Sequence, residues 1–199
     1  CQYCGTAPND IDDEHLVLKL SFPRSHHLFQ NGIPLQNMVN EYFSEIPTDQ
    51  DNGLRCDICC SNNTGNENDR KCRKKPFVTQ EHITKHPQYL IIQLLRFQPT
   101  ATGVQKIENE VIDIQSIVIQ QTDYELISVL NHEGSYTNGH YTALLKANDW
   151  YLCDDINNRK LDKDPVVSKK NYVYIFKKKI SDFEPPPEFV LTDEWQKIP

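Results

Sequence analysis

The sequence predicts an α+β protein built on an antiparallel sheet with few helices. One segment in the first quarter of the chain has the apolar spacing of an amphipathic helix, and short apolar segments separated by polar turns dominate the second half. Strands that follow one another after a lone helix favour an antiparallel sheet over alternating βαβ units. The 199 residues suit one domain, which we place at residues 1–178, followed by a Pro-containing tail or linker at 179–199.

The first part of the chain contains one strand and one helix. Leu16, Leu18 and Leu20 recur at every second position, which predicts a strand with these side chains on one face. Within residues 33–46 the apolar residues recur at helical spacing, and Pro34 suits the first turn of a helix. We interpret this stripe as a face that packs against the core.

The middle of the chain alternates between polar and apolar segments. Residues 61–75 are polar and rich in asparagine, which predicts an exposed loop. Residues 88–95 follow Pro87 as a nearly continuous apolar run, which predicts a strand buried on both faces. Residues 98–106 are interpreted as a loop, and the isoleucines and valines of 107–119 predict one or two more strands.

Four further strands are predicted in the rest of the chain, because each segment is rich in residues that favour strands. They cover residues 124–132, 140–146, 150–154 and 171–176. If residues 147–149 form a three-residue loop, the second and third of these strands make one hairpin in which Lys146 faces Trp150.

Charge and the absence of export signals limit the classes of function that the chain can have. The net charge of −7 makes the chain a poor general binder of nucleic acid and a better partner for a basic peptide or protein. We expect no membrane span, because no apolar run reaches about 18 residues. No secretion signal is seen, which favours an intracellular protein. The chain opens at Cys1 rather than a methionine, so we expect a fragment or a processed product.

Two C-x2-C pairs have the spacing of structural zinc ligands. In a chain without a secretion signal, such pairs are interpreted as metal ligands before disulfides. Four thiolates give a closed tetrahedral zinc site, and the long interval between the pairs fits two β-ribbons that meet at a fingertip. The candidate ligands are Cys1, Cys4, Cys56 and Cys59.

An alternative joins the second cysteine pair to His82 and His86 as a Cys2His2 finger. The interval between Cys59 and His82 is longer than the roughly 12 residues usual in nucleic-acid-binding fingers. The acidic charge also argues against a DNA reader. We therefore interpret these two histidines as ordinary strand and loop residues.

The hairpin at 140–154 brings an imidazole and a carboxylate to one face. In the register above, Thr142 faces Asp154, and His140 lies two residues along on the same face. Diagonal neighbours in a sheet lie about 7–8 Å apart at Cα, which a hydrogen bond between these side chains can bridge. A slip of one residue would bring Asp155 there instead. A carboxylate on one ring nitrogen leaves the other as a base for a Cys or Ser nucleophile, although an ordinary polar surface hairpin fits the spacing too.

Residues 124–155 resemble the histidine box of the ubiquitin-specific proteases, a family of cysteine deubiquitinases. The family pattern is Y-x-L-x-x-V-x-x-H-x-G, then G-H-Y, then a W-Y strand that ends in Asp. Residues 86–97, HPQYLIIQLLRF, resemble the family's P-x-x-L-x-I-x-L-x-R-F strand, NYVYIF is similar to its closing strand, and the cysteine pairs fall where its fingers hold zinc. The histidine-box matches are Tyr124, Leu126, Val129, His132, Gly134, Gly139, His140, Tyr141, Trp150 and Asp154.

This resemblance implies a papain-like cysteine protease fold, of which the chain would supply the palm and fingers. It implies hydrolysis of (iso)peptide bonds at the C-terminal glycine of ubiquitin, through an acyl-enzyme. By the same resemblance His140 is the general base, Asp154 orients it, and Asp155 is a neighbouring support. Ubiquitin or ubiquitinated proteins are the expected partners.

The loop at 131–139 would border the channel for the ubiquitin tail in this resemblance. His132, Gly139 and Tyr141 are therefore candidate substrate-binding residues. For His132, a structural role in the loop is the alternative, and we favour it over a role as a second base.

The chain departs from the family pattern at its start. The family's nucleophilic cysteine lies in an N-terminal box rich in Gly and Asn, which has no counterpart here, so we expect the nucleophile upstream of Cys1 and the thumb to be absent. Cys153 is no substitute, because strand alternation turns it away from the face of Asp154. The chain is then a fragment of an active deubiquitinase, inactive by itself, or a catalytically inactive ubiquitin-binding or scaffold module.

Overall fold

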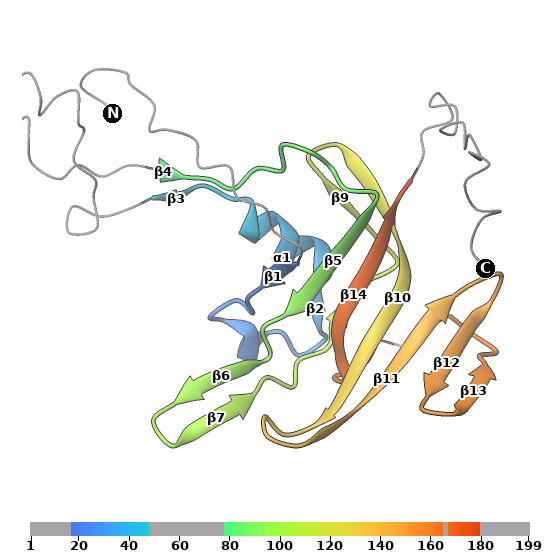
Figure 1. The fold of residues 1–199 in the computed structure, drawn as a ribbon. Helices are drawn as coiled ribbons and strands as arrows, with labels where there is room; N and C mark the ends of the chain where they lie inside the picture. Colours follow the sequence, from blue (N-terminus) through green and yellow to red (C-terminus); the bar gives the residue numbers. More distant parts are fainter. Residues whose placement is uncertain (1–16, 48–77, 165–166, 180–199) are drawn as a thin grey trace, which may run out of the picture.

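The structure, a computed structural model, describes residues 17–47, 78–164 and 167–179. Its centre is an eight-stranded sheet in which β1 pairs with β5 in parallel and the other described pairs are antiparallel (Figure 1). The strand order is β1-β5-β14-β10-β11-β12-β13, and β9 also pairs with β10. The strands are β1 (Leu18–Leu20), β5 (Tyr89–Leu94), β14 (Asn171–Lys178), β10 (Thr122–Gly134), β11 (Gly139–Lys146), β12 (Trp150–Asp154), β13 (Asn157–Lys160) and β9 (Ser116–Ile119).

Smaller elements surround this sheet. The helix α1 (Leu35–Tyr42) contacts β1 and β9, and a 3-10 turn η1 (His26–Leu28) precedes it in the chain. Three two-stranded ladders complete the described part of the fold, and the first of them is parallel. They are β2 (Ile33–Pro34) with β8 (Val111–Ile112), β3 (Ile46–Pro47) with β4 (Val78–Thr79), and β6 (Phe97–Thr100) with β7 (Gly103–Lys106).

The core lies between α1 and one face of the sheet. The helix buries Leu35, Met38 and Val39, which lie on one side of a helix because of their spacing. The predicted helix is confirmed but shorter than residues 33–46. Its C-terminal candidate Ile46 lies instead in β3 and is 54% exposed, and Pro34 immediately precedes the helix.

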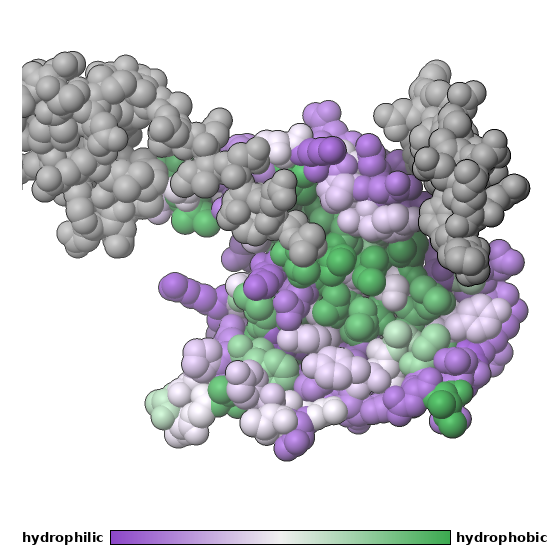
Figure 2. Space-filling model, in the orientation of Figure 1, coloured by the Kyte–Doolittle hydropathy of each residue, from purple (hydrophilic) through white to green (hydrophobic). Residues whose placement is uncertain are grey.

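The other face of the sheet is also apolar but only half buried. In β14 the partly exposed Val173 and Ile175 alternate with the buried Tyr174 and Phe176. Figure 2 shows apolar side chains gathered on this face over β5, β14 and β10. The prediction that residues 88–95 are buried on both faces is therefore wrong. Core side chains cover one face of β5 only, and Tyr89 at its start is 55% exposed.

A buried arginine holds the segments that border the candidate site. Arg96 is fully buried, and its Nε donates a hydrogen bond to the Asn171 carbonyl at 2.6 Å. Its Nη1 donates to the carbonyls of Ile107 at 2.8 Å and Asn109 at 2.9 Å. These bonds link the end of β5 to the start of β14 and to the chain after β7, and so fix the β6–β7 hairpin.

The strands predicted at 124–132, 140–146, 150–154 and 171–176 are confirmed, as are two strands within 107–119. The predicted loop at 98–106 is wrong, because these residues form most of the β6–β7 hairpin. The Thr100 hydroxyl donates to the Gly103 carbonyl at 3.0 Å, and the positive φ of Gly103 closes the turn. The strand β13 was not predicted, since its four residues are polar and exposed.

Several predictions fall outside the described residues. They are the loop at 61–75, the four candidate zinc ligands, Leu16 and most of the tail. Because β14 ends at Lys178 and residues 180–199 are outside the described part, the division at 178/179 stays a prediction. No helix in the described ranges is long and apolar enough to cross a membrane.

Candidate catalytic site

The β11–β12 hairpin has the register that the sequence predicted. Lys146 pairs with Trp150, and the Ala147 amide donates to the Asp149 carbonyl at 2.9 Å, which closes the three-residue turn. Ala143 of β11 pairs with Cys153 of β12, the residue before Asp154. The hairpin therefore places His140 and the C-terminal end of β12 on one face.

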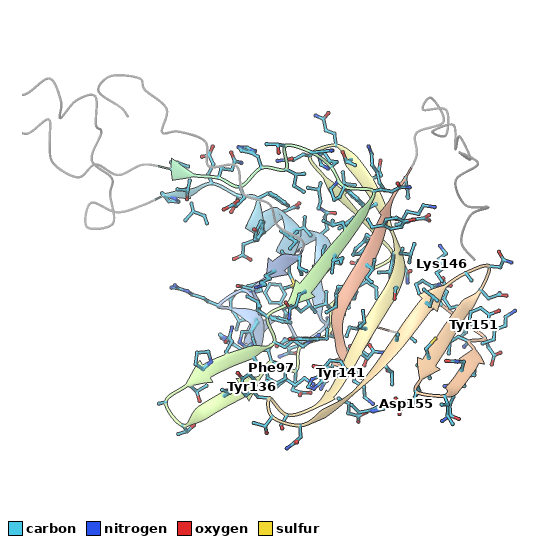
Figure 3. All side chains as sticks on the ribbon, viewed as in Figure 1. Phe97, Tyr136, Tyr141, Lys146, Tyr151 and Asp155 are labelled. Atoms are coloured by element: carbon cyan, nitrogen blue, oxygen red, sulfur yellow. The ribbon has the colours of Figure 1, made fainter. Side chains whose placement is uncertain are left out.

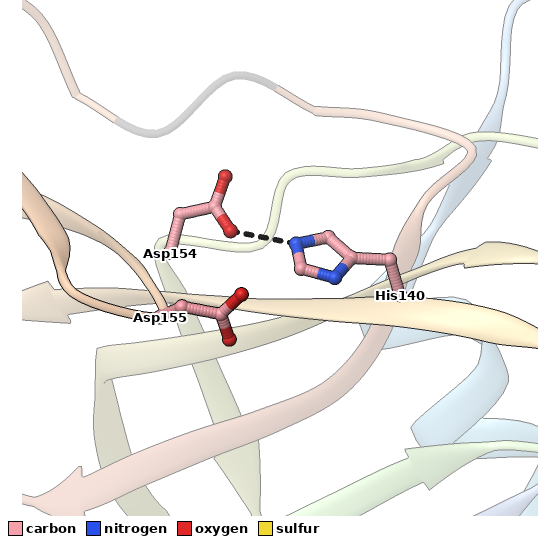
Figure 4. Close-up of side chains that lie close together, drawn as sticks. All are labelled: His140, Asp154 and Asp155. Atoms are coloured by element: carbon pink, nitrogen blue, oxygen red, sulfur yellow. Dashed lines mark hydrogen bonds and ion pairs between the residues drawn. The ribbon is translucent and has the colours of Figure 1, made fainter.

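His140 and Asp154 are in direct contact at that end of the hairpin (Figure 4). The His140 Nε2 lies 2.6 Å from Asp154 Oδ1, so a neutral ring donates this hydrogen bond through Nε2. Within the described residues, no hydrogen bond is formed by His140 Nδ1. The side chains of His140 and Asp154 are 51% and 41% exposed, so the ring that carries Nδ1 is open to groups from outside this part of the chain.

Asp155 lies beside the same ring. Its φ of 50° is in the left-handed region, which turns the chain sharply at the end of β12 and brings its carboxylate toward His140. The imidazole and both carboxylates offer atoms that lie within 4.8 Å of one another. The predicted grouping of His140, Asp154 and Asp155 is thus present in the structure.

The carboxylates favour the protonated form of His140. The hydrogen bond to Asp154 and its negative charge raise the pKa of His140, and the charges of Asp155 and Glu133 act in the same direction. An imidazole in this setting accepts a proton readily and is stabilised once charged. The electrostatics therefore suit a general base.

The same three groups could in principle hold a metal ion. Exposed acidic groups often lie this close without one, and the 2.6 Å bond between His140 and Asp154 already engages Nε2. A carboxylate–imidazole pair with one free ring nitrogen is the arrangement that proton transfer requires. The geometry of the group therefore suits proton transfer better than metal binding.

Aromatic rings gather beside the hairpin, and we call them the aromatic cluster. Figure 3 shows Phe97, Tyr136 and Tyr141 close together near the start of β11. The His132 ring centroid lies 4.7 Å from that of Tyr141 and 5.5 Å from that of Phe97. Tyr136 and Tyr141 are 67% and 54% exposed, so the cluster presents an apolar surface to solvent. Its members are Phe97, His132, Tyr136, Tyr141 and Tyr172.

The three candidate substrate-binding residues differ in accessibility. Tyr141 is exposed, as a contact residue must be. A Cβ on Gly139 would overlap the His132 Nε2 and lie 2.9 Å from the Glu133 carbonyl oxygen, so only glycine fits there. His132 is only 4% exposed. Its burial favours the alternative of a structural histidine, and a substrate-binding role for His132 stays a prediction.

Sequence reasoning missed Lys106. Its Nζ donates to the His132 carbonyl at 2.8 Å and lies 5.8 Å from the centre of the Phe97 ring. It thereby ties the end of the β6–β7 hairpin to β10, next to the aromatic cluster. No pattern in the sequence indicates this contact, because residues 98–106 predict a loop.

Cys153 is the one cysteine within the described ranges. It pairs with Ala143 across the hairpin and is partly buried. Alternation along β12 turns it to the face opposite Asp154, as predicted. It therefore does not serve as the nucleophile for His140.

The candidate zinc ligands lie outside the described residues, but the flanks of one pair are defined. β3 and β4 pair at Ile46 with Thr79 and at Pro47 with Val78. The segment between them, which contains Cys56 and Cys59, therefore begins and ends at the same two-stranded ladder. That geometry is compatible with the predicted finger.

The two histidines of the alternative Cys2His2 finger have partners of their own. The His82 Nδ1 lies 3.2 Å from Gln120 Nε2, and the His86 Nδ1 lies 3.4 Å from the Tyr124 hydroxyl. These contacts are typical of ordinary polar residues and support the interpretation of His82 and His86 as such.

Comparisons with known proteins agree on one family. The model of the ubiquitin carboxyl-terminal hydrolase family matches residues 4–176. A probable ubiquitin carboxyl-terminal hydrolase of Acanthamoeba polyphaga mimivirus is 27% identical over 187 residues, covering 87% of this chain and 37% of that protein. Human ubiquitin carboxyl-terminal hydrolase 21 is 24% identical over 188 residues, covering 88% of this chain and 30% of that protein. The chain thus spans about a third of the length of these relatives.

Solved structures share the fold. A SAGA DUB module, Ubp8/Sgf11/Sus1/Sgf73 bound to monoubiquitin, matches with a TM-score of 0.69 and 18% identity, covering 90% of this chain and 39% of the solved one. The same module bound to ubiquitin aldehyde matches with a TM-score of 0.62 and 18% identity, covering 83% and 36% of the two chains. The predicted papain-like α+β fold is confirmed by this likeness.

Proposed function

The chain belongs to the ubiquitin carboxyl-terminal hydrolase family, and on that premise we propose that it supplies the palm and fingers of a thiol-dependent deubiquitinase. The reaction is hydrolysis of (iso)peptide bonds at the C-terminal glycine of ubiquitin. The observation that carries the proposal is the 2.6 Å bond from His140 Nε2 to Asp154, with Nδ1 accessible on the same exposed ring.

His140 moves the proton in both halves of this reaction. Its Nδ1 takes the proton of a cysteine thiol, and the thiolate attacks the carbonyl carbon of the terminal glycine of ubiquitin. The imidazolium gives that proton to the departing amine as the C–N bond breaks, which leaves a thioester. His140 then deprotonates a water that attacks the thioester, and the ubiquitin carboxyl group and the thiol are released.

The two aspartates have different tasks in this scheme. Asp154 accepts the hydrogen bond from Nε2–H, which fixes the tautomer that leaves Nδ1 free as the base. Asp155 makes no hydrogen bond to the ring in the described structure, and its charge favours the imidazolium. We therefore assign orientation to Asp154 and a weaker electrostatic contribution to Asp155.

The nucleophile comes from outside residues 1–199 in this proposal. Cys153 is turned away from the site, and the sequence contains no segment like the family's cysteine box. We place the nucleophilic cysteine upstream of Cys1 in the parent protein. This chain alone is then inactive, because it lacks the group that attacks the substrate.

Ubiquitin is the proposed partner. The matched SAGA DUB module structures contain monoubiquitin or ubiquitin aldehyde. Next to His140, Tyr141 and Gly139 are both exposed, and the Tyr141 ring offers an apolar surface that suits an extended peptide tail. The acidic net charge of −7 fits a protein partner better than a nucleic acid.

We also propose a structural zinc ion in the fingers, held by Cys1, Cys4, Cys56 and Cys59. When bound, zinc would join the two cysteine pairs and stabilise the fold, and it would take no part in the reaction. The pairing of β3 with β4 at the base of the second pair supports this assignment.

A catalytically inactive ubiquitin-binding module of the same fold is the second candidate. The observation in its favour is that the described residues provide a base and an orienting acid but no nucleophile for them. Turnover separates the two functions. The full-length gene product is mixed with ubiquitin that carries a C-terminal fluorogenic amide, beside its His140→Ala and His86→Ala variants.

Release of the fluorophore by the wild type and the His86 variant, with loss in His140→Ala, is the expected result. His86 is a suitable control because it is a partly buried histidine near Tyr124, at the far end of β10 from the site. Ubiquitin binding without release from folded protein would favour the inactive module.

A further inference from the structure

The strand that carries His140 begins against a second imidazole. Gly139 and Tyr141 lie on one face of β11, and His140 projects from the other. His132 pairs with Tyr141 across the ladder, and its ring contacts Gly139 so closely that no Cβ fits between them. The positions of the His132 ring and of the first residue of β11 are therefore coupled by direct contact.

Both the ring and the backbone of His132 are held in place. His132 is 4% exposed, and its ring packs against those of Phe97 and Tyr172, with centroids 5.5 Å and 5.8 Å away. The backbone carbonyl accepts a hydrogen bond from Lys106 Nζ at 2.8 Å. Because the His132 ring is fixed in this way, it can restrict the movement of β11, which packs against it.

His132 is suited to packing rather than to proton transfer. Its buried Nδ1 has no hydrogen-bond partner in the described structure. Burial lowers the pKa of His132, and the nearby positive charge of Lys106 acts in the same direction. The ring is therefore neutral near pH 7, and its contact with Gly139 is one of van der Waals packing.

We propose that His132 is a positioning residue for His140, because its buried ring supports Gly139 and so sets where His140 meets Asp154. The proposal rests on the proposed function in taking His140 as the base. Glu133, the residue after His132, pairs directly with His140. A small displacement of β11 would thus change the 2.6 Å hydrogen bond between His140 and Asp154.

The first test measures the His140–Asp154 contact itself. The histidine rings of the full-length protein are labelled with 13C, and the pKa of His140 is followed by NMR in the wild type, His132→Ala and the matched control His86→Ala. We expect the pKa of His140 to fall toward its ordinary value in His132→Ala only, because its bond to Asp154 weakens. An unchanged His140 pKa in folded His132→Ala overturns the proposal.

The second test measures turnover of the fluorogenic ubiquitin amide. Misplacement of a reacting group by about 1 Å can lower a rate roughly 100-fold. We therefore expect kcat to fall by up to about 100-fold in His132→Ala, with KM nearly unchanged, since His132 does not contact substrate. A change confined to KM contradicts a positioning role.

A double-mutant cycle tests the contact between His132 and Gly139. Gly139→Ala should lower kcat in the wild type, because its Cβ overlaps the His132 ring, and should cost less in the His132→Ala background. Some loss remains there, since the Glu133 carbonyl lies 2.9 Å from the new Cβ. Equal losses in both backgrounds overturn the proposal. If His132→Ala does not fold, His132→Gln takes its place.

Failure of the proposed function is visible separately. If the wild type neither turns over the amide nor reacts with a ubiquitin electrophile, the enzyme assignment fails. The NMR titration of His140 still decides whether His132 positions that ring.

Discussion

Replacement of the buried Arg96 by methionine should destabilise the protein by about 3 kcal/mol. The guanidinium donates three hydrogen bonds to backbone carbonyls, at 2.6, 2.8 and 2.9 Å. Methionine leaves these acceptors without that donor, and a net contribution of about 1 kcal/mol per bond gives roughly 3 kcal/mol. Burial lowers the pKa of Arg96, which shows that keeping its charge buried costs free energy. Removing that charge offsets part of the lost stability, whereas the carbonyls left unpaired add to the loss.

Urea unfolding and thermal melting of the full-length protein measure this change. At about 2–4 °C per kcal/mol for a domain of this size, the Tm should fall by roughly 6–12 °C. Arg159→Met is the matched control, because Arg159 lies exposed on β13 and should change stability little. Arg96→Lys should restore only part of the stability, since a single ammonium cannot reproduce the planar fork that reaches three carbonyls.

A loss below about 0.5 kcal/mol, the size expected of a neutral surface substitution, would contradict this role of Arg96. An equal loss in the Arg96 and Arg159 variants would also refute it. Either result would mean that the three carbonyls find other donors. In that case the β6–β7 hairpin would not depend on Arg96 for its place beside the aromatic cluster.

Three further predictions concern the site and the fingers. Asp154→Asn should lower the pKa of His140 in an NMR titration and slow turnover by roughly 100- to 10,000-fold, and Asp155→Asn should have a smaller effect on both; equal effects would contradict the separate roles. The pKa of His140 is higher in the folded than in the unfolded protein, so its pair with Asp154 stabilises the fold. This stabilisation is complete below the unfolded-state pKa of about 6.5 and is lost as the pH rises through the folded-state pKa. Urea titrations should show Asp154→Asn losing more stability at pH 5.5 than at pH 9, and a constant difference would speak against this linkage. Elemental analysis should find zinc bound to the full-length protein. The zinc content should be lower in Cys56→Ser but not in Cys153→Ser, and equal contents in both variants would rule out the finger site.

Local patterns in the sequence were sufficient for most of the sheet and for the central contact of the site. The strand-favouring residues of each segment predicted β10, β11, β12 and β14. On the assumption of a three-residue turn after Lys146, the hairpin register placed His140 beside Asp154, and a slip of one residue would have placed Asp155 there. Both inferences rest on neighbouring residues, which sequence patterns describe well.

Contacts between distant segments were not predictable in the same way. Phe97, Tyr136 and Tyr172 come from three separate segments and meet only in the folded sheet. The bond from Lys106 to the His132 carbonyl joins residues 26 positions apart and leaves no pattern in the sequence. The β6–β7 hairpin was missed because its residues are mostly exposed and have no apolar alternation.

Covalent capture of a ubiquitin probe with a C-terminal electrophile tests the central claim, that His140 serves a thiol nucleophile. The full-length gene product is incubated with the probe beside its His140→Ala and His86→Ala variants, and the modified residue is located by mass spectrometry. We predict an adduct on a cysteine upstream of Cys1, formed at the same rate in His86→Ala and far more slowly in His140→Ala. Equal rates in all three proteins, an adduct on Cys153, or no adduct from folded wild-type protein would contradict it.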